Sequence, residues 1–161
     1  MYHRPSPQTQ ADETGDLFRS RLDNMIDMRH PLVTLAGKIN WNALETAWGA
    51  RAQPTGAGNP ALPVRLVAGL LYLKHIHNLS DEAVCARWLE NPYWQFFTGE
   101  VWFQPRFPCD PSSLTRYRKR LGEAGLEELL SLTIETGKTM KVVSTRDLQR
   151  VIVDSTVQEK A

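Results

Sequence analysis

The chain has 161 residues, of which 42% are hydrophobic and 23% charged, a balance typical of a soluble globular protein. Its net charge of +1 at pH 7 excludes nucleic-acid binding through overall basicity, so any such contact requires a local basic patch. Cys85 and Cys109 fit neither a zinc motif nor a disulfide framework, which favours a reducing compartment. The sequence contains neither a signal peptide nor an apolar run long enough for a membrane span, so we expect an intracellular protein.

The N-terminal third of the chain predicts a small helical unit preceded by an arm. Residues 1–15 are polar and proline-containing, and we expect them to be disordered. Apolar residues recur at helical spacing over residues 16–30, and the proline at position 31 ends that helix. Pro31 can begin a short helix to Leu35, and Asn40 is a suitable N-cap for the next one. These segments predict a helical unit over residues 16–48.

Residues 49–61 predict a linker, because three glycines and two prolines within residues 49–60 preclude a regular element. A larger helical domain is expected over residues 62–142. It opens with helices over 62–77 and 81–90, the second capped by Ser80. An aromatic-rich helix over 91–99 follows, with Asn91 as its N-cap and a proline at its first position. Two more helices follow at 110–121 and from Leu126 to about Met140, separated by a glycine-marked break. For the last helix we expect these residues to face the core: Leu126, Leu129, Leu130 and Thr133.

Two helix pairs could form a helix-turn-helix. The helix over 81–90 carries three acidic residues and a single arginine, so we interpret it as a scaffold helix that does not approach phosphates. The helix over 110–121 has small polar groups in its first turn and basic groups in its second half, the arrangement expected of a DNA-recognition helix. Leu114, Tyr117 and Leu121 recur at three and four residues, and we expect this apolar back to hold the helix to the core. A solvated basic face is the alternative interpretation. The residues predicted to bind DNA are Ser112, Ser113, Thr115, Arg116, Arg118, Lys119 and Arg120.

A β-branched run, Val151 to Val153, predicts a buried strand near the end of the chain. Asp154 follows it directly, where a carboxylate could be held rigidly as half of a Mg²⁺ site. Taken alone, the Asp-Ser-Thr sequence favours a turn that merely ends the strand over a metal site.

The ordered set of segments resembles the N-terminal part of bacterial insertion-sequence transposases of family five, the InsH-like group. As an ordered set the matching stretches are specific and cover most of residues 17–161. They are His30 to Ala36 with Ile39 to Trp41, Pro63 to Lys74, Leu79 to Glu82, Trp88, Asn91 to Gly99, Asp110 to Gly122, and Val151 to Thr156.

The resemblance implies a mainly α-helical DNA-binding headpiece, helix-turn-helix-like, that ends in the first β-strand of a truncated ribonuclease-H-like domain over residues 143–161. It aligns Asp154 with the first acid of an Asp-Asp-Glu triad, which makes this residue both the expected catalytic residue and the expected metal ligand. The other two acids would lie beyond Ala161. The full-length parent would therefore be a metal-dependent transposase using Mg²⁺ or Mn²⁺. This chain alone is expected to bind no metal tightly and to be catalytically incomplete.

The expected partner is double-stranded DNA at the terminal inverted repeats of the element, with assembly into a homo-oligomer as a further expectation and no membrane association. The resemblance implies a bacterial cytoplasmic, nucleoid-associated location. Two alternatives remain open at this stage. The chain could be a stand-alone DNA-binding regulator or truncated competitor for the same ends, or it could be a helical oligomerisation module.

Overall fold

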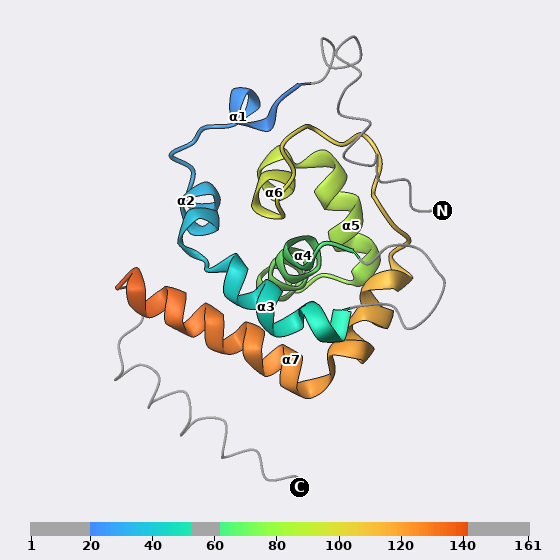
Figure 1. Cartoon of the computed structure of the whole chain (residues 1–161). Helices are drawn as coiled ribbons and strands as arrows, with labels where there is room; N and C mark the ends of the chain where they lie inside the picture. The colour runs from blue at the N-terminus through green and yellow to red at the C-terminus, as the bar shows by residue number, and fades with distance from the viewer. Residues whose placement is uncertain (1–19, 53–61, 142–161) are drawn as a thin grey trace, which may run out of the picture.

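The computed structural model describes residues 20–52 and 62–141, which are mainly α-helical (Figure 1). The predicted arm, the predicted strand Val151 to Val153 and Asp154 lie outside these residues. None of the helices in the described ranges is both long and apolar enough to cross a bilayer. The described helices are α1 (Leu22–Met25), α2 (Pro31–Lys38), α3 (Trp41–Ala52), α4 (Val64–Ile76), α5 (Asp81–Glu90), α6 (Pro92–Phe97) and α7 (Ser112–Thr139).

Helix α4 is the central element of the fold. It is seen nearly end-on in Figure 1, with α3, α5, α6 and α7 arranged around it. Every residue from Leu66 to Leu71 is buried, as expected for a helix that is packed on all sides. The core that surrounds α4 combines Leu44 and Trp48 of α3 with residues of α5, α6 and α7. The two helical units predicted from the sequence therefore contribute to a single hydrophobic core.

The predicted helix over 16–30 is wrong in its extent, because only Leu22–Met25 is helical within the described part of that range. The chain just before it pairs with the loop that follows α6. The Leu22 amide donates to the Val101 carbonyl at 2.9 Å, and the Phe103 amide donates to the Ser20 carbonyl at 3.0 Å. These backbone hydrogen bonds hold Arg21 extended and prevent the helix from starting earlier.

The next two helices begin where the sequence predicts, and at the start of α2 the structure adds a cap by His30 that was not predicted. His30 accepts a hydrogen bond from the Leu32 amide at 3.1 Å, and Pro31 occupies the first turn of α2. The Asn40 side chain accepts from the Ala43 amide at 3.1 Å at the start of α3. Both helices run further than predicted, α2 to Lys38 and α3 to Ala52. The predicted linker is thus helical at its beginning, because one glycine weakens a helix by only about 1 kcal/mol and alanines follow it.

Helices α5 and α6 also begin at the predicted caps. The Ser80 hydroxyl accepts from the Ala83 amide at 3.1 Å, and the Asn91 side chain accepts from the Tyr93 amide at 3.0 Å. At the other end of α6, the Arg65 guanidinium donates to the carbonyls of Phe96 and Phe97, each at 3.1 Å. A basic group satisfies the free carbonyls at the end of a helix in this way.

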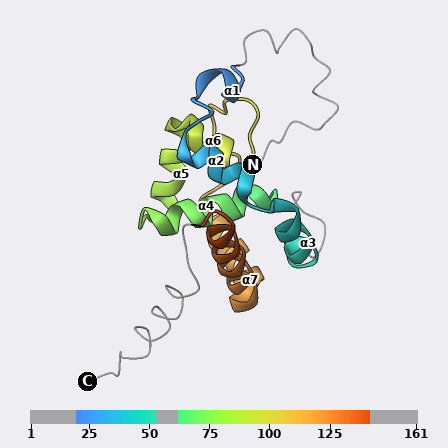
Figure 2. The ribbon, with the colours of Figure 1, turned by 90° about the vertical axis from the view of Figure 1, so that its left-hand side faces the viewer.

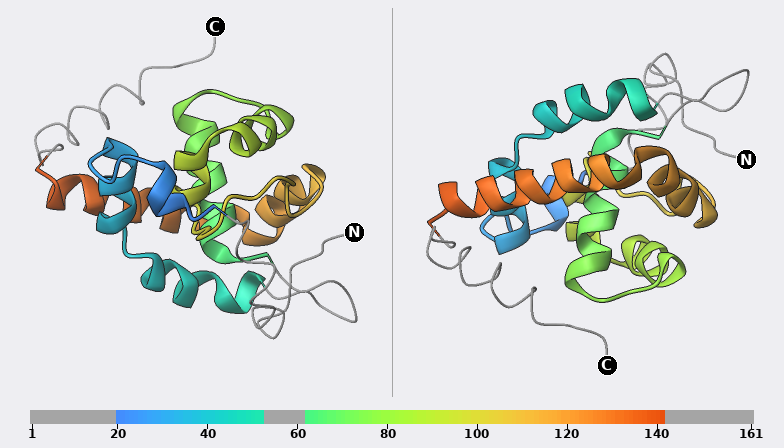
Figure 3. Two further views of the ribbon diagram at one scale, coloured as in Figure 1. Left: turned by 90° about the horizontal axis from the view of Figure 1, so that it is seen from above. Right: turned by 90° about the horizontal axis from the view of Figure 1, so that it is seen from below.

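Helix α7 is a pair of helical segments joined at Gly122, whose backbone has φ 65° and ψ −169°. It lies across α3 and α4, as the side view and the view from below show (Figures 2 and 3). The break confirms the predicted interruption, but Gly125 belongs to the second segment and is buried. The predicted inward face is partly wrong, because Leu126 and Leu130 are exposed. A leucine-rich helix offers more than one apolar face, and the contact with α3 and α4 selects the face of Leu129 and Leu132.

Candidate nucleic-acid interface

The first segment of α7 is anchored to the core through one face. Leu114, Tyr117 and Leu121 are 0%, 1% and 3% exposed, at spacings of three and four residues. This confirms the apolar back predicted for the helix. Because three large side chains fix its rotation, the residues on the opposite face are held toward solvent.

That opposite face carries the exposed basic residues of the helix. Arg116, Lys119 and Arg120 are exposed, as is Ser112 one turn earlier. Arg116 donates to the Ser112 hydroxyl at 2.6 Å, and the Arg120 guanidinium lies 5.2 Å from the centre of the Tyr117 ring. We call Ser112, Arg116, Lys119 and Arg120 the basic stripe. Their spacing of three to four residues places them along one side of α7.

Two of the residues predicted to bind DNA lie beside this stripe and contact α5 instead. The Thr115 hydroxyl donates to Oδ2 of Asp81 at 2.6 Å. The Arg118 guanidinium donates to both carboxylate oxygens of Asp81, at 3.2 and 3.3 Å. Lys74 of α4 donates to Oδ1 of the same carboxylate at 2.5 Å. A single carboxylate at the start of α5 therefore connects three helices.

The Asp81 carboxylate is held in its charged form. Burial alone would raise its pKa, but hydrogen bonds from Lys74 and Thr115 and the charges of Arg118 and Lys74 outweigh burial and lower the pKa. The side chain of Asp81 is only 10% exposed. Sequence reasoning missed this contact because Asp81 was assigned only the role of a first-turn acid in a scaffold helix. No local signal pairs it with a residue 37 positions later.

The start of α7 differs slightly from the prediction. The helix begins at Ser112, and Asp110 remains outside it, accepting a hydrogen bond from the Ser112 amide at 2.9 Å. Ser113 is half-buried. Ser112 is therefore the residue of the predicted polar tip that is most open to a partner.

The part of the chain that the structure describes contains no candidate metal site. No group of three histidine, cysteine or acidic side chains capable of holding a metal ion is found in residues 20–52 and 62–141. Burial raises the pKa of the Cys85 thiol to about 12 and that of Cys109 to about 11, so both thiols are protonated at neutral pH.

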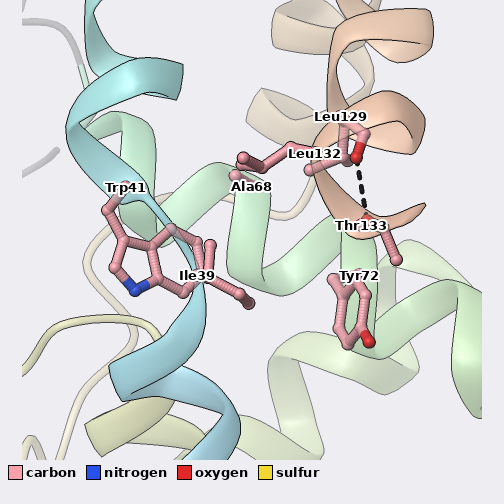
Figure 4. Close-up of a pocket in the computed structure, with 7 residues that line it drawn as sticks. All are labelled: Ile39, Trp41, Ala68, Tyr72, Leu129, Leu132 and Thr133. Carbon is pink, nitrogen blue, oxygen red and sulfur yellow. Dashed lines mark hydrogen bonds between the residues drawn. The ribbon is translucent and has the colours of Figure 1, made fainter. Parts of the chain in front are cut away.

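A small hollow between α3, α4 and α7 is lined mainly by apolar side chains (Figure 4). The polar side-chain groups of its lining are the hydroxyls of Tyr72 and Thr133 and the indole N–H of Trp41. Thr133 donates to the Leu129 carbonyl and Trp41 to the Ala36 carbonyl, each at 2.8 Å. The remaining lining is formed by Ile39, Ala68, Leu129 and Leu132. The hollow lies where α7 packs against α3 and α4, and its lining contains no acidic side chain, histidine or other basic side chain.

The fold and the site together define a helical domain that presents one anchored helix with a basic, solvent-facing side. The chain belongs to a family of transposase domains, since residues 20–120 match the model described as "Transposase domain (DUF772)". It is also 48% identical over 155 residues to the "Uncharacterized protein ORF8 in nfe locus" of Rhizobium meliloti, covering 96% of this chain and 74% of that relative. No solved structure gave a significant match.

Proposed function

We propose that this chain is the DNA-binding part of a transposase and that the basic stripe of α7 contacts the terminal inverted repeats of its element. The observation that carries the proposal is the division of α7 into an anchored apolar face and an exposed face with three positive charges. Membership of the transposase-domain family supplies the class of activity. Arginine and lysine side chains on one helix side suit phosphate contacts, and Ser112 at the helix start suits a base edge.

Arg118 and Thr115 have a different role in this proposal. Both contact Asp81, so they set the position of the helix and do not bind DNA directly. The set of residues proposed to contact DNA from the structure is therefore the basic stripe alone, which is smaller than the set proposed from the sequence. Ser113 is half-buried and lies beside the stripe.

The finer assignment to a metal-dependent, family-five transposase also remains our proposal. In a full-length parent, Asp154 would be one of three acidic ligands for Mg²⁺ or Mn²⁺. One carboxylate cannot position two such ions. We therefore expect this chain, mixed with terminal-repeat DNA and Mg²⁺, to bind the DNA without cutting it, and strand cleavage on a denaturing gel would contradict this.

The salt dependence of DNA binding tests the proposed interface. Fluorescence anisotropy would be measured with a duplex carrying the terminal repeat and with a scrambled duplex of the same composition. For the wild-type chain we expect tighter binding to the repeat and an affinity that falls steeply as salt rises. The variant R116A/K119A should weaken binding and reduce the slope of log K against log salt by about 2, because each phosphate contact contributes about 0.9.

The matched control is R29A/K38A, which also removes one arginine and one lysine. Both residues are exposed, and Lys38 lies in the last turn of α2, at the far side of the molecule from the start of α7 (Figure 1). This control should leave the slope nearly unchanged. Equal losses in the two variants would show that net charge alone drives binding, and an unchanged slope in R116A/K119A would reject the basic stripe.

A further inference from the structure

The second segment of α7 has an apolar face directed away from the core. Leu126 is 39% exposed and Leu130 is 60% exposed. Ile134, one turn further along the same side, is half-buried. The spacing of four residues aligns these three side chains along the helix, and we call Leu126, Leu130 and Ile134 the apolar strip.

This face is not the one that holds α7 to the rest of the domain. Gly125 and Thr136 are buried, and Leu129 and Leu132 pack against the core. Seen from below, α7 lies in front of the other described elements along its length (Figure 3). Within the described residues, Leu126 and Leu130 therefore form an exposed apolar surface on a helix whose other side packs against the core.

The charges beside the strip run from acidic to basic along the helix. Glu127 is exposed near its start, and Lys138 is exposed in the last turn. Two such helices side by side in the same direction would place like charges level with each other. In opposite directions, Glu127 of each helix comes close to Lys138 of the other, so the surface is complementary to itself.

We propose that the second segment of α7 pairs in an antiparallel manner with the same segment of a second copy of this chain. In the register that places Leu130 of one copy opposite Ile134 of the other, Glu127 of one copy is offset by only one residue from Lys138 of the other. The contact is isologous, because a twofold axis between the two helices repeats each interaction. Burial of the apolar strip supplies most of the affinity, because exposed ion pairs add little. The two ion pairs instead select the antiparallel direction over the parallel one.

Replacement of Leu130 by Glu tests the apolar contact in the full chain by sedimentation equilibrium over a range of protein concentrations. The wild-type chain should show a reversible dimer. Because each dimer buries two copies of Leu130, L130E should raise the dimer dissociation constant by roughly a hundredfold or more. The control is I76E at the end of α4, since Ile76 is 55% exposed and lies outside α7. I76E should dimerise as the wild type does.

Charge exchange tests the direction and the identity of the partner. At low salt, E127K alone and K138E alone should each raise the dissociation constant about five- to tenfold, because like charges then face each other across the pair. An equal mixture of the two variants should regain dimerisation through mixed dimers, and so should the double variant E127K/K138E. Circular dichroism at a concentration low enough for every chain to be monomeric should show the same helix content and unfolding temperature for all variants.

A wild-type chain that is monomeric at all concentrations, or a dimer unaffected by L130E, would overturn the proposal. Dimers that weaken in both single charge variants but are not regained in the mixture would overturn the antiparallel register. The inference does not depend on DNA binding, because these measurements use protein alone. Its failure would leave the assignment of the basic stripe intact.

Discussion

Asp81 and Arg118 form a bidentate ion pair between α5 and α7, with the guanidinium nitrogens 3.2 and 3.3 Å from the two carboxylate oxygens. The same carboxylate also accepts from Lys74 and Thr115. Because Asp81 and its partners together come from three helices, this group fixes how α7 is oriented on the domain. The basic stripe that we propose to bind DNA lies on the same helix segment, so the contacts of Asp81 also fix the direction in which the stripe faces.

Substitution of Asp81 separates positioning from DNA contact. We expect D81N to lower the free energy of unfolding by about 1–3 kcal/mol, because three donors lose a charged acceptor. It should also weaken DNA binding without changing the salt slope, since Asp81 touches no phosphate. Chemical denaturation and salt-dependent anisotropy would measure both effects. The control is D23N, because Asp23 pairs with Arg21 in solvent. A reduced slope in D81N would contradict the positioning role.

The contribution of Asp81 to stability should depend on pH in a defined direction. Its pKa is lowered below the ordinary value of 3.8, so the folded state favours the charged carboxylate. That stabilisation is present above the unfolded pKa and is lost as the pH falls through the folded pKa. The difference in unfolding free energy between wild type and D81N should therefore have its maximum value near neutral pH and should decrease below about pH 4. A difference that grows on acidification would refute the assignment.

Gly122 determines where α7 breaks. Its φ of 65° with ψ of −169° is a conformation that L side chains rarely adopt. We expect G122A to destabilise the chain by about 1–3 kcal/mol, as a thermal melt would show. G37A is the matched control, because Gly37 lies within α2 and an added Cβ would meet no atom within 4 Å. It should raise the unfolding temperature, since alanine favours a helix over glycine by up to about 1 kcal/mol.

Gln95 connects α5, α6 and the loop before α7 through buried hydrogen bonds. Its amide donates to the carbonyls of Trp88 and Gln104, and its oxygen accepts from the Gln104 amide at 2.7 Å. Q95L should lower the free energy of unfolding by about 2–4 kcal/mol, because these backbone groups lose their partners. Q104L, which removes one side-chain bond to the Trp102 carbonyl, should cost no more than about 1 kcal/mol. Equal losses would argue against a special role for Gln95.

Helix starts could be predicted because their signals are local. Ser80, Asn91 and Asn40 each cap the helix that the sequence assigned to them, through a side chain that bonds an amide two or three residues away. The apolar back of the first segment of α7 was predicted for the same reason. Leu114, Tyr117 and Leu121 are spaced by the helical period, and all three are buried.

Contacts between distant segments could not be predicted in this way. The start of α1 at Leu22 follows from backbone pairing with the loop at Val101. The exposure of Leu130 follows from which side of α7 meets α3 and α4, and leucines on two sides of that helix leave the choice open. The separation of Arg118 from Arg116 depends on the position of Asp81, which only the packing of α5 against α7 defines.

The helices of the larger unit, most of their caps, and the concentration of positive charge between Arg116 and Arg120 could all be predicted from local sequence patterns. These features depend on residues within a few positions of one another, where backbone geometry fixes the spacing. The packing of the helices against one another sets which of those charges face solvent, which one is bonded to Asp81, and which leucines of α7 remain exposed. A helix repeats its faces regularly along its length, and the choice among them is made by the neighbouring helices that bury one face and leave the other to water.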